Sequence, residues 1–229
     1  MAWDFAAQIH ALTGYDADDN SGTTETGETF SDMATQWLTD AAKEVIHLLP
    51  PNLKQKCAQI VVLNNTATTL DLDAMGEILQ VTRENADSGY QTPCRKIPAV
   101  YGGTASDSTN MMHYATATDP VYWTTSNDSD EALLFIKPDP TANQTANVYH
   151  IGYPSSVPFS ANTISNFPDE AEYLVVLRAA ITTAEYLLAI EEDVEIYGAI
   201  ITTLKSQYKE GIQALKTGEI GALQQKGAG

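Results

Sequence analysis

Residues 167–190 read FPDEAEYLVVLRAAITTAEYLLAI. Pro168 stands where a helix can begin, and Asp169 and Glu170 follow in the first turn, where carboxylates stabilise the positive end of a helix. Apolar residues then recur every three or four positions, and others widen the stripe: Leu174, Val175, Leu177, Ala179, Ile181, Ala184, Tyr186 and Leu188. This pattern predicts a helix over 168–190 that is buried on more than one side.

The next stretch repeats the helical period. Residues 193–216 carry apolar and aromatic side chains at the same spacing: Val194, Tyr197, Ile201, Leu204, Tyr208, Ile212 and Leu215. Only a short connection separates this pattern from the preceding one. The two segments therefore predict a C-terminal hairpin of antiparallel helices.

A third helix is predicted near the start of the chain. Ser31 and Asp32 are candidates for its N-cap, an apolar period follows, and Pro50-Pro51 ends it. The helix should span about 31–49. With the hairpin it forms a predicted helical bundle, made of residues 31–57 and 161–217.

Between these helical parts, residues 58–160 change character. Short β-branched and aromatic runs alternate with Asp, Asn, Gly and Pro, and six of them are strand candidates: 60–63, 77–83, 94–97, 121–125, 132–137 and 146–153. No helix-length segment separates them, so parallel crossovers are not expected. The predicted fold class is α+β, a helical bundle with an inserted antiparallel β domain.

The N-terminal segment, residues 1–30, precedes the residues of this bundle. Residues 2–13 should form a short helix that stops at Gly14. Residues 15–32 hold six acidic and no basic side chains among Asn, Ser, Thr and Gly, which predicts an extended acidic arm. A partner-binding role and a plain solvated loop both remain open for this arm.

The C-terminal residues 218–229 form a Gly-rich segment that predicts a flexible tail. The tail nevertheless contains Ile220 and Leu223. A free tail needs no apolar side chain, whereas a tail that becomes ordered on contact can insert both into a groove. Ile220 and Leu223 are therefore the candidate partner-binding residues.

Charge restricts the functions open to this protein. The 229 residues include 30 acidic and 12 basic side chains, a formal net charge of −18 at pH 7. A sequence-reading nucleic-acid binder needs a basic stripe that neutralises phosphates, and no window supplies one. We expect no secretory leader and no membrane span, because no apolar run reaches 18 residues. Cys57 and Cys94, without a CxxC pair, fit a reduced cytoplasmic compartment.

The sequence offers no motif for catalysis. GxxxxGK[ST], GxGxxG, GxSxG and HExxH do not occur, and the four histidines fall in four different predicted elements. The acidic run Glu191, Glu192, Asp193 and Glu195 lacks calcium-loop spacing and stands where carboxylates stabilise a helix start. We therefore expect no enzyme activity, no cofactor and no metal.

Aromatic residues leave one alternative open. Tyr122, Trp123, Tyr149 and Tyr153 lie on predicted strands. Such residues can form a stacking platform, which would make this part a carbohydrate-binding β module, or they can pack across strands.

The order of the segments carries a further signal. A helix ending in Leu48-Leu49-Pro50 precedes β-rich segments, and the hairpin follows. The segments read GEILQVTR (76–83), CRKIP (94–98), YAT (114–116), DPVY (119–122) and FPDEAE (167–172). Over residues 30–217 this order resembles the head-to-tail connector (adaptor) proteins of tailed bacteriophages.

The resemblance implies a structural virion protein of the neck, at the head-tail junction, assembled in the cytoplasm of the host bacterium. A homo-oligomeric ring of about twelve copies would bind the portal protein and join it to tail or neck proteins. Double-stranded DNA would pass through the ring during ejection without specific binding. The resemblance also favours the portal as the partner of Ile220 and Leu223. Another neck or tail ring component, such as a tail-completion or tail-tube protein, is an alternative.

Overall fold

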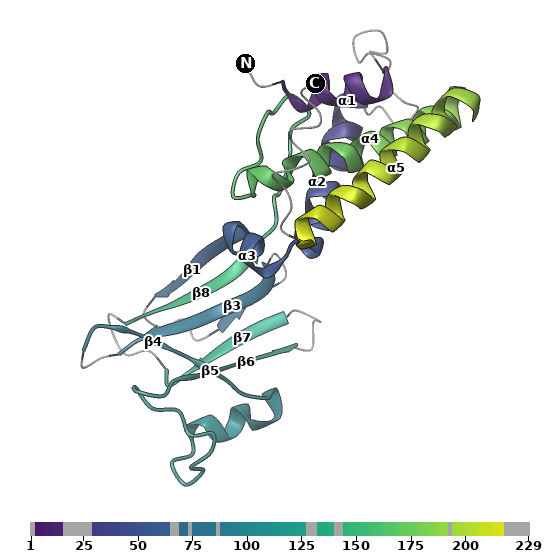
Figure 1. The fold of residues 1–229 in the computed structure, drawn as a ribbon. Coiled ribbons are helices and arrows are strands. Elements are labelled where there is room, and N and C mark those ends of the chain that lie inside the picture. Colours follow the sequence, from purple (N-terminus) through teal and green to yellow (C-terminus); the bar gives the residue numbers. More distant parts are fainter. Residues whose placement is uncertain are drawn as a thin grey trace. The chain divides into compact units, whose positions relative to one another are not determined.

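The computed structural model describes eight stretches of the chain: residues 3–15, 29–64, 69–72, 75–85, 88–126, 132–139, 144–191 and 194–217. The chain divides into two units (Figure 1). The helical unit consists of Met1–Cys57 and Tyr153–Gly229, and the β unit consists of Ala58–Gly152. Helices and sheets occur together, which confirms the predicted α+β class.

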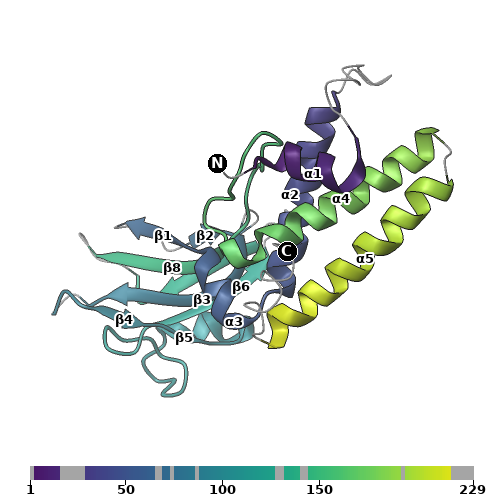
Figure 2. The same ribbon diagram turned by 45° about the horizontal axis from the view of Figure 1, so that its top comes forward.

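The helical unit is organised around one central helix. Its elements are α1 (Phe5–Thr13), α2 (Phe30–Leu48), α3 (Pro51–Lys54), the 3-10 turn η1 (Gln55–Cys57), α4 (Asp169–Glu191) and α5 (Val194–Thr217). Helices α4 and α5 lie side by side in both views (Figures 1 and 2), and α4 also packs against α1 and α2. Four successive residues of α4, 174 to 177, are buried, and at 3.6 residues per turn they cover most of its circumference. The expectation of burial on more than one side is confirmed.

Composition alone would also allow α4 to cross a membrane. Among the described helices, Asp169–Ile190 is the stretch long and apolar enough to do so. Half of it is buried inside the structure, however, as in the core helix of a soluble protein. Its apolar character is accounted for by contacts with three neighbouring helices.

The start of α2 differs from the prediction. Thr29, not Ser31 or Asp32, is the N-cap: its hydroxyl accepts the Asp32 backbone N–H, while the Asp32 carboxylate accepts the Thr29 N–H. This capping box satisfies two orphan donors and begins the helix at Phe30. Trp37 of the same helix is half-buried and contacts Phe30 and Tyr186. The predicted stop of α1 at Gly14 is confirmed by its left-handed φ of 72°.

A polar network joins three helices of this unit. The Arg178 Nε of α4 donates to the Glu44 carboxylate of α2 at 2.8 Å, and the Tyr208 hydroxyl of α5 donates to the other Glu44 oxygen at 3.1 Å. Burial raises the pKa of Tyr208, and the neighbouring Glu44 carboxylate raises it further. Because one carboxylate accepts from both hairpin helices, Glu44 fixes the register of α2 against them.

The β region ends earlier than expected. The last strand stops at Gly152, and the residues from Tyr153 on belong to the helical unit, although residues up to 160 were predicted to lie in the β domain. Two threonines of α2 hold this segment: Val157 N–H donates to the Thr39 hydroxyl at 2.9 Å and Phe159 N–H to the Thr35 hydroxyl at 3.1 Å. The spacing of apolar residues in the sequence does not reveal these two hydrogen bonds.

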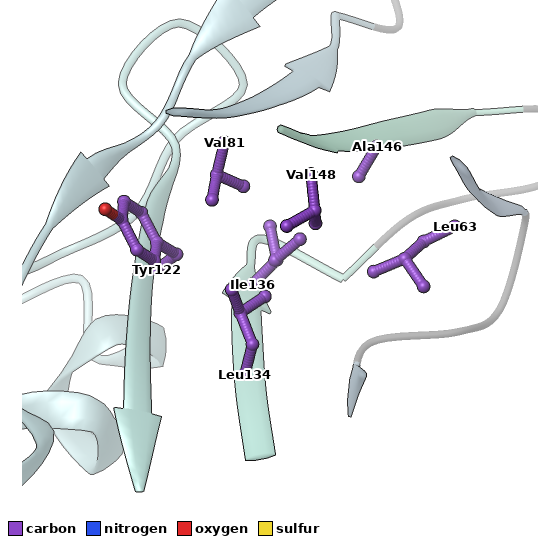
Figure 3. Packing of buried hydrophobic residues seen from close by; sticks show 7 residues of the cluster. All are labelled: Leu63, Val81, Tyr122, Leu134, Ile136, Ala146 and Val148. Carbon is purple, nitrogen blue, oxygen red and sulfur yellow. The ribbon is translucent and has the colours of Figure 1, made fainter. Parts of the chain in front are cut away.

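The β unit contains two four-stranded sheets. The first has the order β1-β8-β3-β4 and the second β2-β7-β6-β5. The strands are β1 (Ala58–Asn64), β2 (Thr69–Asp71), β3 (Met75–Glu84), β4 (Gln91–Pro93), β5 (Arg95–Lys96), β6 (Val121–Ser126), β7 (Ala132–Lys137) and β8 (Thr145–Gly152). Figure 3 shows the core between the sheets, which takes side chains from both: Leu63, Val81, Tyr122, Leu134, Ile136, Ala146 and Val148. The two sheets therefore pack face to face.

Two features of the sheets were not predicted. β2 and β4 have three residues each, too few to show an alternating pattern. In addition, β5 pairs with β6 in parallel, so the expectation of a purely antiparallel domain is wrong in this place. The reason is the long connection from 97 to 120, which contains the 3-10 segment η2 (Ala99–Ser106) and returns the chain to the same end of the sheet.

A buried arginine ties β3 to the turn after β7. Arg83 is only 4% exposed, and its guanidinium donates to Pro138 O at 2.6 Å, Asp139 O at 2.8 Å and Gln144 Oε1 at 2.8 Å. Three acceptors from one turn therefore depend on a single side chain.

Replacing Arg83 by methionine is expected to destabilise the β unit by about 3 kcal/mol, because it removes the three hydrogen bonds that a buried guanidinium donates. The matched control is Arg95→Met, which breaks the exposed ion pair with Asp119 and should cost less than about 1 kcal/mol. Urea unfolding of both variants measures the difference. If both variants lost the same free energy of unfolding, the buried contacts of Arg83 would contribute no more than the exposed ion pair of Arg95.

Candidate interaction surfaces

Exposed large apolar side chains of the β unit are concentrated in one segment, Ala99–Tyr114, which we call the apolar tip. Five of its large apolar side chains are exposed: Val100 (80%), Tyr101 (43%), Met111 (95%), Met112 (75%) and Tyr114 (37%). Water-exposed apolar groups of this size are unfavourable unless another surface covers them. The tip therefore has the character of a protein-contact surface.

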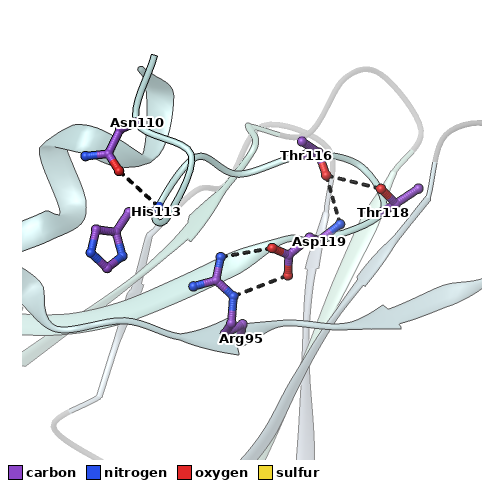
Figure 4. Close-up of polar contacts among 6 residues, drawn as sticks. All are labelled: Arg95, Asn110, His113, Thr116, Thr118 and Asp119. Atoms are coloured by element: carbon purple, nitrogen blue, oxygen red, sulfur yellow. Dashed lines mark hydrogen bonds and ion pairs between the residues drawn. The ribbon is translucent and has the colours of Figure 1, made fainter. Parts of the chain in front are cut away.

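Polar contacts hold the base of the tip (Figure 4). The Arg95 guanidinium donates to the Asp119 carboxylate at 2.9 Å, and the Asp119 N–H donates to the Thr116 hydroxyl at 3.0 Å. Within the tip, the His113 N–H donates to Asn110 Oδ1 at 3.2 Å, and the imidazole of His113 stacks on the ring of Tyr101 with centroids 4.2 Å apart. The segment is thus shaped before any partner arrives, which reduces the entropy lost on binding.

The inner side of the tip packs on the second sheet. Ile97, Ala105, Ala115, Val121 and Trp123 form a buried cluster there, on the face opposite to the one that carries Tyr122. Gly102 is required for this contact, since a Cβ at that position would lie 2.5 Å from the indole of Trp123. The tip is therefore anchored by a small core of its own.

The tip is nearly free of charge. Asp107 is the one Asp, Glu, Lys or Arg between residues 97 and 118, in a chain of which 18% is charged. A partner protein can therefore approach this part without desolvating a set of carboxylates. This surface was not predicted from the sequence, although the pair Met111-Met112 in a segment of Gly, Ser, Thr and Asn was a usable signal.

A groove of about 380 Å³ lies between α1, α4 and α5 in the helical unit. Leu12, Tyr173 and Leu177 are among its lining residues. Gly211 lets the helices approach, because a Cβ there would lie 2.5 Å from Leu174 Cδ2. The groove is large enough for an apolar side chain of another segment.

Groups suited to catalysis do not converge in the described stretches of the chain. No group of three His, Cys, Asp or Glu side chains that could hold a metal ion occurs among the described residues. His47 contacts the Tyr153 hydroxyl, His113 stacks on Tyr101, and the buried His150 lies against the Ile151 carbonyl. These three histidines have separate structural surroundings.

The two cysteines are structural. Burial raises the pKa of the Cys57 thiol to about 11 and that of the Cys94 thiol to about 12. Neither is disulfide-bonded. Both thiols therefore remain protonated and weakly nucleophilic near neutral pH.

The aromatic residues of the strands do not form one open platform. Tyr122 and Trp123 are each only 8% exposed and belong to clusters on opposite faces of β6. The Trp123 ring stacks on Phe135 at 5.4 Å. Tyr153 lies in the other unit, beside His47. Packing, the second possibility, accounts for Tyr122 and Trp123.

The predicted partner-binding residues Ile220 and Leu223 lie outside the described residues, as does most of the predicted acidic arm. For Ile220 and Leu223 the assignment remains a prediction from sequence.

The described residues form apolar contact surfaces on the helical unit and on the β unit. Such surfaces are typical of a protein that belongs to a larger assembly. A family model described as SU10 adaptor protein matches residues 7–225, so the chain belongs to the SU10 adaptor protein family. The match begins at residue 7 and so includes most of α1 and of the N-terminal segment, which the resemblance from residue 30 did not cover. A search of curated proteins finds no match.

Membership in a phage adaptor family makes the chain a bacteriophage structural protein and a virion component. It implies a non-enzymatic role and suggests a place in the neck or tail.

Proposed function

We propose that the protein is the head-to-tail connector of a tailed phage. About twelve copies form a ring in the neck, which binds the portal on one side and tail or neck proteins on the other. DNA passes through the centre. The observation that carries the proposal is the adaptor-family match over nearly the whole chain, residues 7–225.

The charge distribution supports a channel that lets DNA slide. The net charge is −18, and several of the few basic side chains already face carboxylates of the same chain: Lys43, Lys56, Arg95, Lys137, Arg178 and Lys205. These cations are not available in full to phosphates. A negative lining repels the duplex and avoids trapping it.

The purified protein is therefore expected to show no duplex DNA binding at physiological salt, because no basic stripe offsets its negative field. An electrophoretic mobility assay with a random-sequence duplex tests this. A salt-sensitive shift at micromolar protein would contradict the proposed sliding channel.

A connector needs one surface for each neighbour. We assign Ile220 and Leu223 to the portal and the apolar tip to a protein of the tail. The tip suits this role because it is preshaped, apolar and nearly uncharged, and a ring would present it many times to a symmetric partner.

The double substitution Met111→Ser and Met112→Ser should leave the melting temperature unchanged, since both side chains are almost fully exposed. The joining of tails to DNA-filled heads should fall by more than about tenfold, as expected when central apolar anchors are lost. Ile190→Ser with Ile196→Ser removes two apolar side chains that are more than half exposed on the helical unit and is the control. If both double variants joined tails to heads equally well, the apolar tip would not be the surface that binds the tail.

The proposal as a whole is tested by mixing the purified protein with portal rings of the same phage and separating the complexes by size. Co-elution is expected with portal rings. Binding to isolated tails but not to portal rings would favour the alternative, a tail-completion or tail-tube component.

A further inference from the structure

The two edge strands of the first sheet differ from those of the second sheet in their charge. Its edge strand β1 (AQIVVLN) has seven residues and no charge. At the other end, β4 is extended by backbone bonds from Asn85 N to Tyr90 O and from Cys94 N to Val81 O, so the ladder runs from Tyr90 to Cys94, again without a charged residue. Among the described strands, none pairs with the outer edge of either.

The second sheet protects its edges in the usual way. Its edge strand β2 has three residues and ends in Asp71, and β5 consists of Arg95 and Lys96. Short edge strands and charged side chains prevent pairing with a foreign strand. The first sheet lacks the charges on both sides, and β1 is also long.

Exposed apolar side chains accompany both uncharged edges. Ile60 and Val62 on β1 are 55% and 51% exposed, and Tyr90 beside β4 is 78% exposed. The register places Val62 opposite Asn147, Asn147 opposite Thr82, and Thr82 opposite Pro93. Directly opposite residues share a face, so Ile60 and Val62 lie on the same face of the sheet as Pro93 and Gln91.

Strand direction makes the two edges complementary. Each strand of the first sheet is antiparallel to its neighbour, so β1 and β4, at the ends of four strands, run in opposite directions. A second copy placed head to tail in the same orientation would bring its β4 antiparallel to β1. Repetition of this heterologous contact can close into a ring.

We propose that neighbouring copies in the connector ring pair β1 of one copy with β4 of the next, which joins the first sheets into one continuous sheet. This proposal rests on the proposed ring. Copies of a protein with net charge −18 repel each other, and the favoured contact is therefore one where neither side carries charge. The added strand supplies backbone hydrogen bonds at positions other than Pro93, which has no N–H, and covers Ile60 and Val62 with cross-strand neighbours.

Cross-linking of rings assembled on the portal tests the pairing. The double variant Val62→Cys, Gln91→Cys, treated with a short bismaleimide, should give a ladder of covalent oligomers on a denaturing gel, whereas each single variant gives none. Gln80→Cys combined with Gln91→Cys is the matched control, because Gln80 is exposed but lies on the inner strand β3. The unmodified protein measures any background from Cys57 and Cys94.

Three results would overturn the pairing. A dimer from Val62→Cys alone would indicate twofold β1–β1 contact, a ladder from the Gln80 control would indicate packing of faces, and intact rings without a ladder would place the interface elsewhere. In the last case the proposed ring stands and only the pairing fails. If the unmodified protein forms no ring even with the portal, both fail.

A charge at the edge provides a second test that needs no cross-link. Val62→Lys should raise the protein concentration needed for ring assembly by about tenfold or more, since lysine on an edge strand opposes pairing. Gln80→Lys adds the same charge to the same face and should have little effect. Circular dichroism confirms that both variants fold, and equal assembly by both would overturn the proposal.

Discussion

Leu134→Ala is expected to destabilise the β unit by about 2 to 5 kcal/mol, the range for removing a leucine side chain from a well-packed core. Leu134 is fully buried on β7, within the cluster that both sheets share. The lost side chain would leave a cavity between two sheets that cannot easily collapse. This is among the largest effects expected from one substitution.

The cysteines allow this loss to be located. Cys57 belongs to the helical unit and Cys94 to the β unit, and the raised pKa values of both thiols make them slow to react in the native state. In Leu134→Ala, Cys94 should become reactive at a lower urea concentration while Cys57 keeps its native protection. Quantitative alkylation followed by peptide mass analysis measures both sites in one sample.

Leu174→Ala is the reciprocal control. Leu174 is fully buried on α4, so this variant should expose Cys57 at lower urea and leave Cys94 protected. If both thiols became reactive together in both variants, the two units would unfold as one cooperative body. That outcome would contradict the expected separate responses.

Deletion of residues 218–229 should abolish attachment to portal-containing heads while leaving the melting temperature unchanged. Ordering about ten residues costs on the order of 10 kcal/mol of backbone entropy, so two apolar anchors cannot hold one isolated tail. We expect the contact to depend on added backbone hydrogen bonds and on the many tails of a ring. When every copy lacks its anchors, the loss of attachment should therefore be cooperative and nearly complete.

The contribution of Ile220 and Leu223 can be separated from that of the tail backbone. Ile220→Ser with Leu223→Ser should reproduce most of the deletion, whereas Gln224→Ala with Gln225→Ala keeps both anchors and should attach normally. Attachment is measured by sedimentation of labelled protein with heads. Normal attachment of the truncated protein would show that the tail is not the portal contact.

The helices could be predicted from the sequence because long apolar periods leave few alternatives. The stripes of α4 and α5 extend over 23 and 24 residues, and proline or glycine marks several helix ends. The N-cap Thr29 was missed, because three neighbouring polar residues can each cap a helix and only geometry distinguishes them.

The β unit was less predictable since its decisive contacts are distant in sequence. The parallel pair β5–β6 is separated by the whole 97–120 connection, and Arg83 finds its acceptors more than fifty positions away. Exposure of Ile60 and Val62 was also hidden, because an apolar strand has the same composition whether it lies at an edge or in the middle of a sheet.

The central claim, that this adaptor-family protein forms the ring that joins the portal to the tail, is tested most directly by native mass spectrometry of the protein with portal rings. The account predicts one dominant complex in which about twelve copies are bound to a single portal ring. A portal that remains bare at saturating protein, under conditions in which its tail-side partners bind, would contradict it.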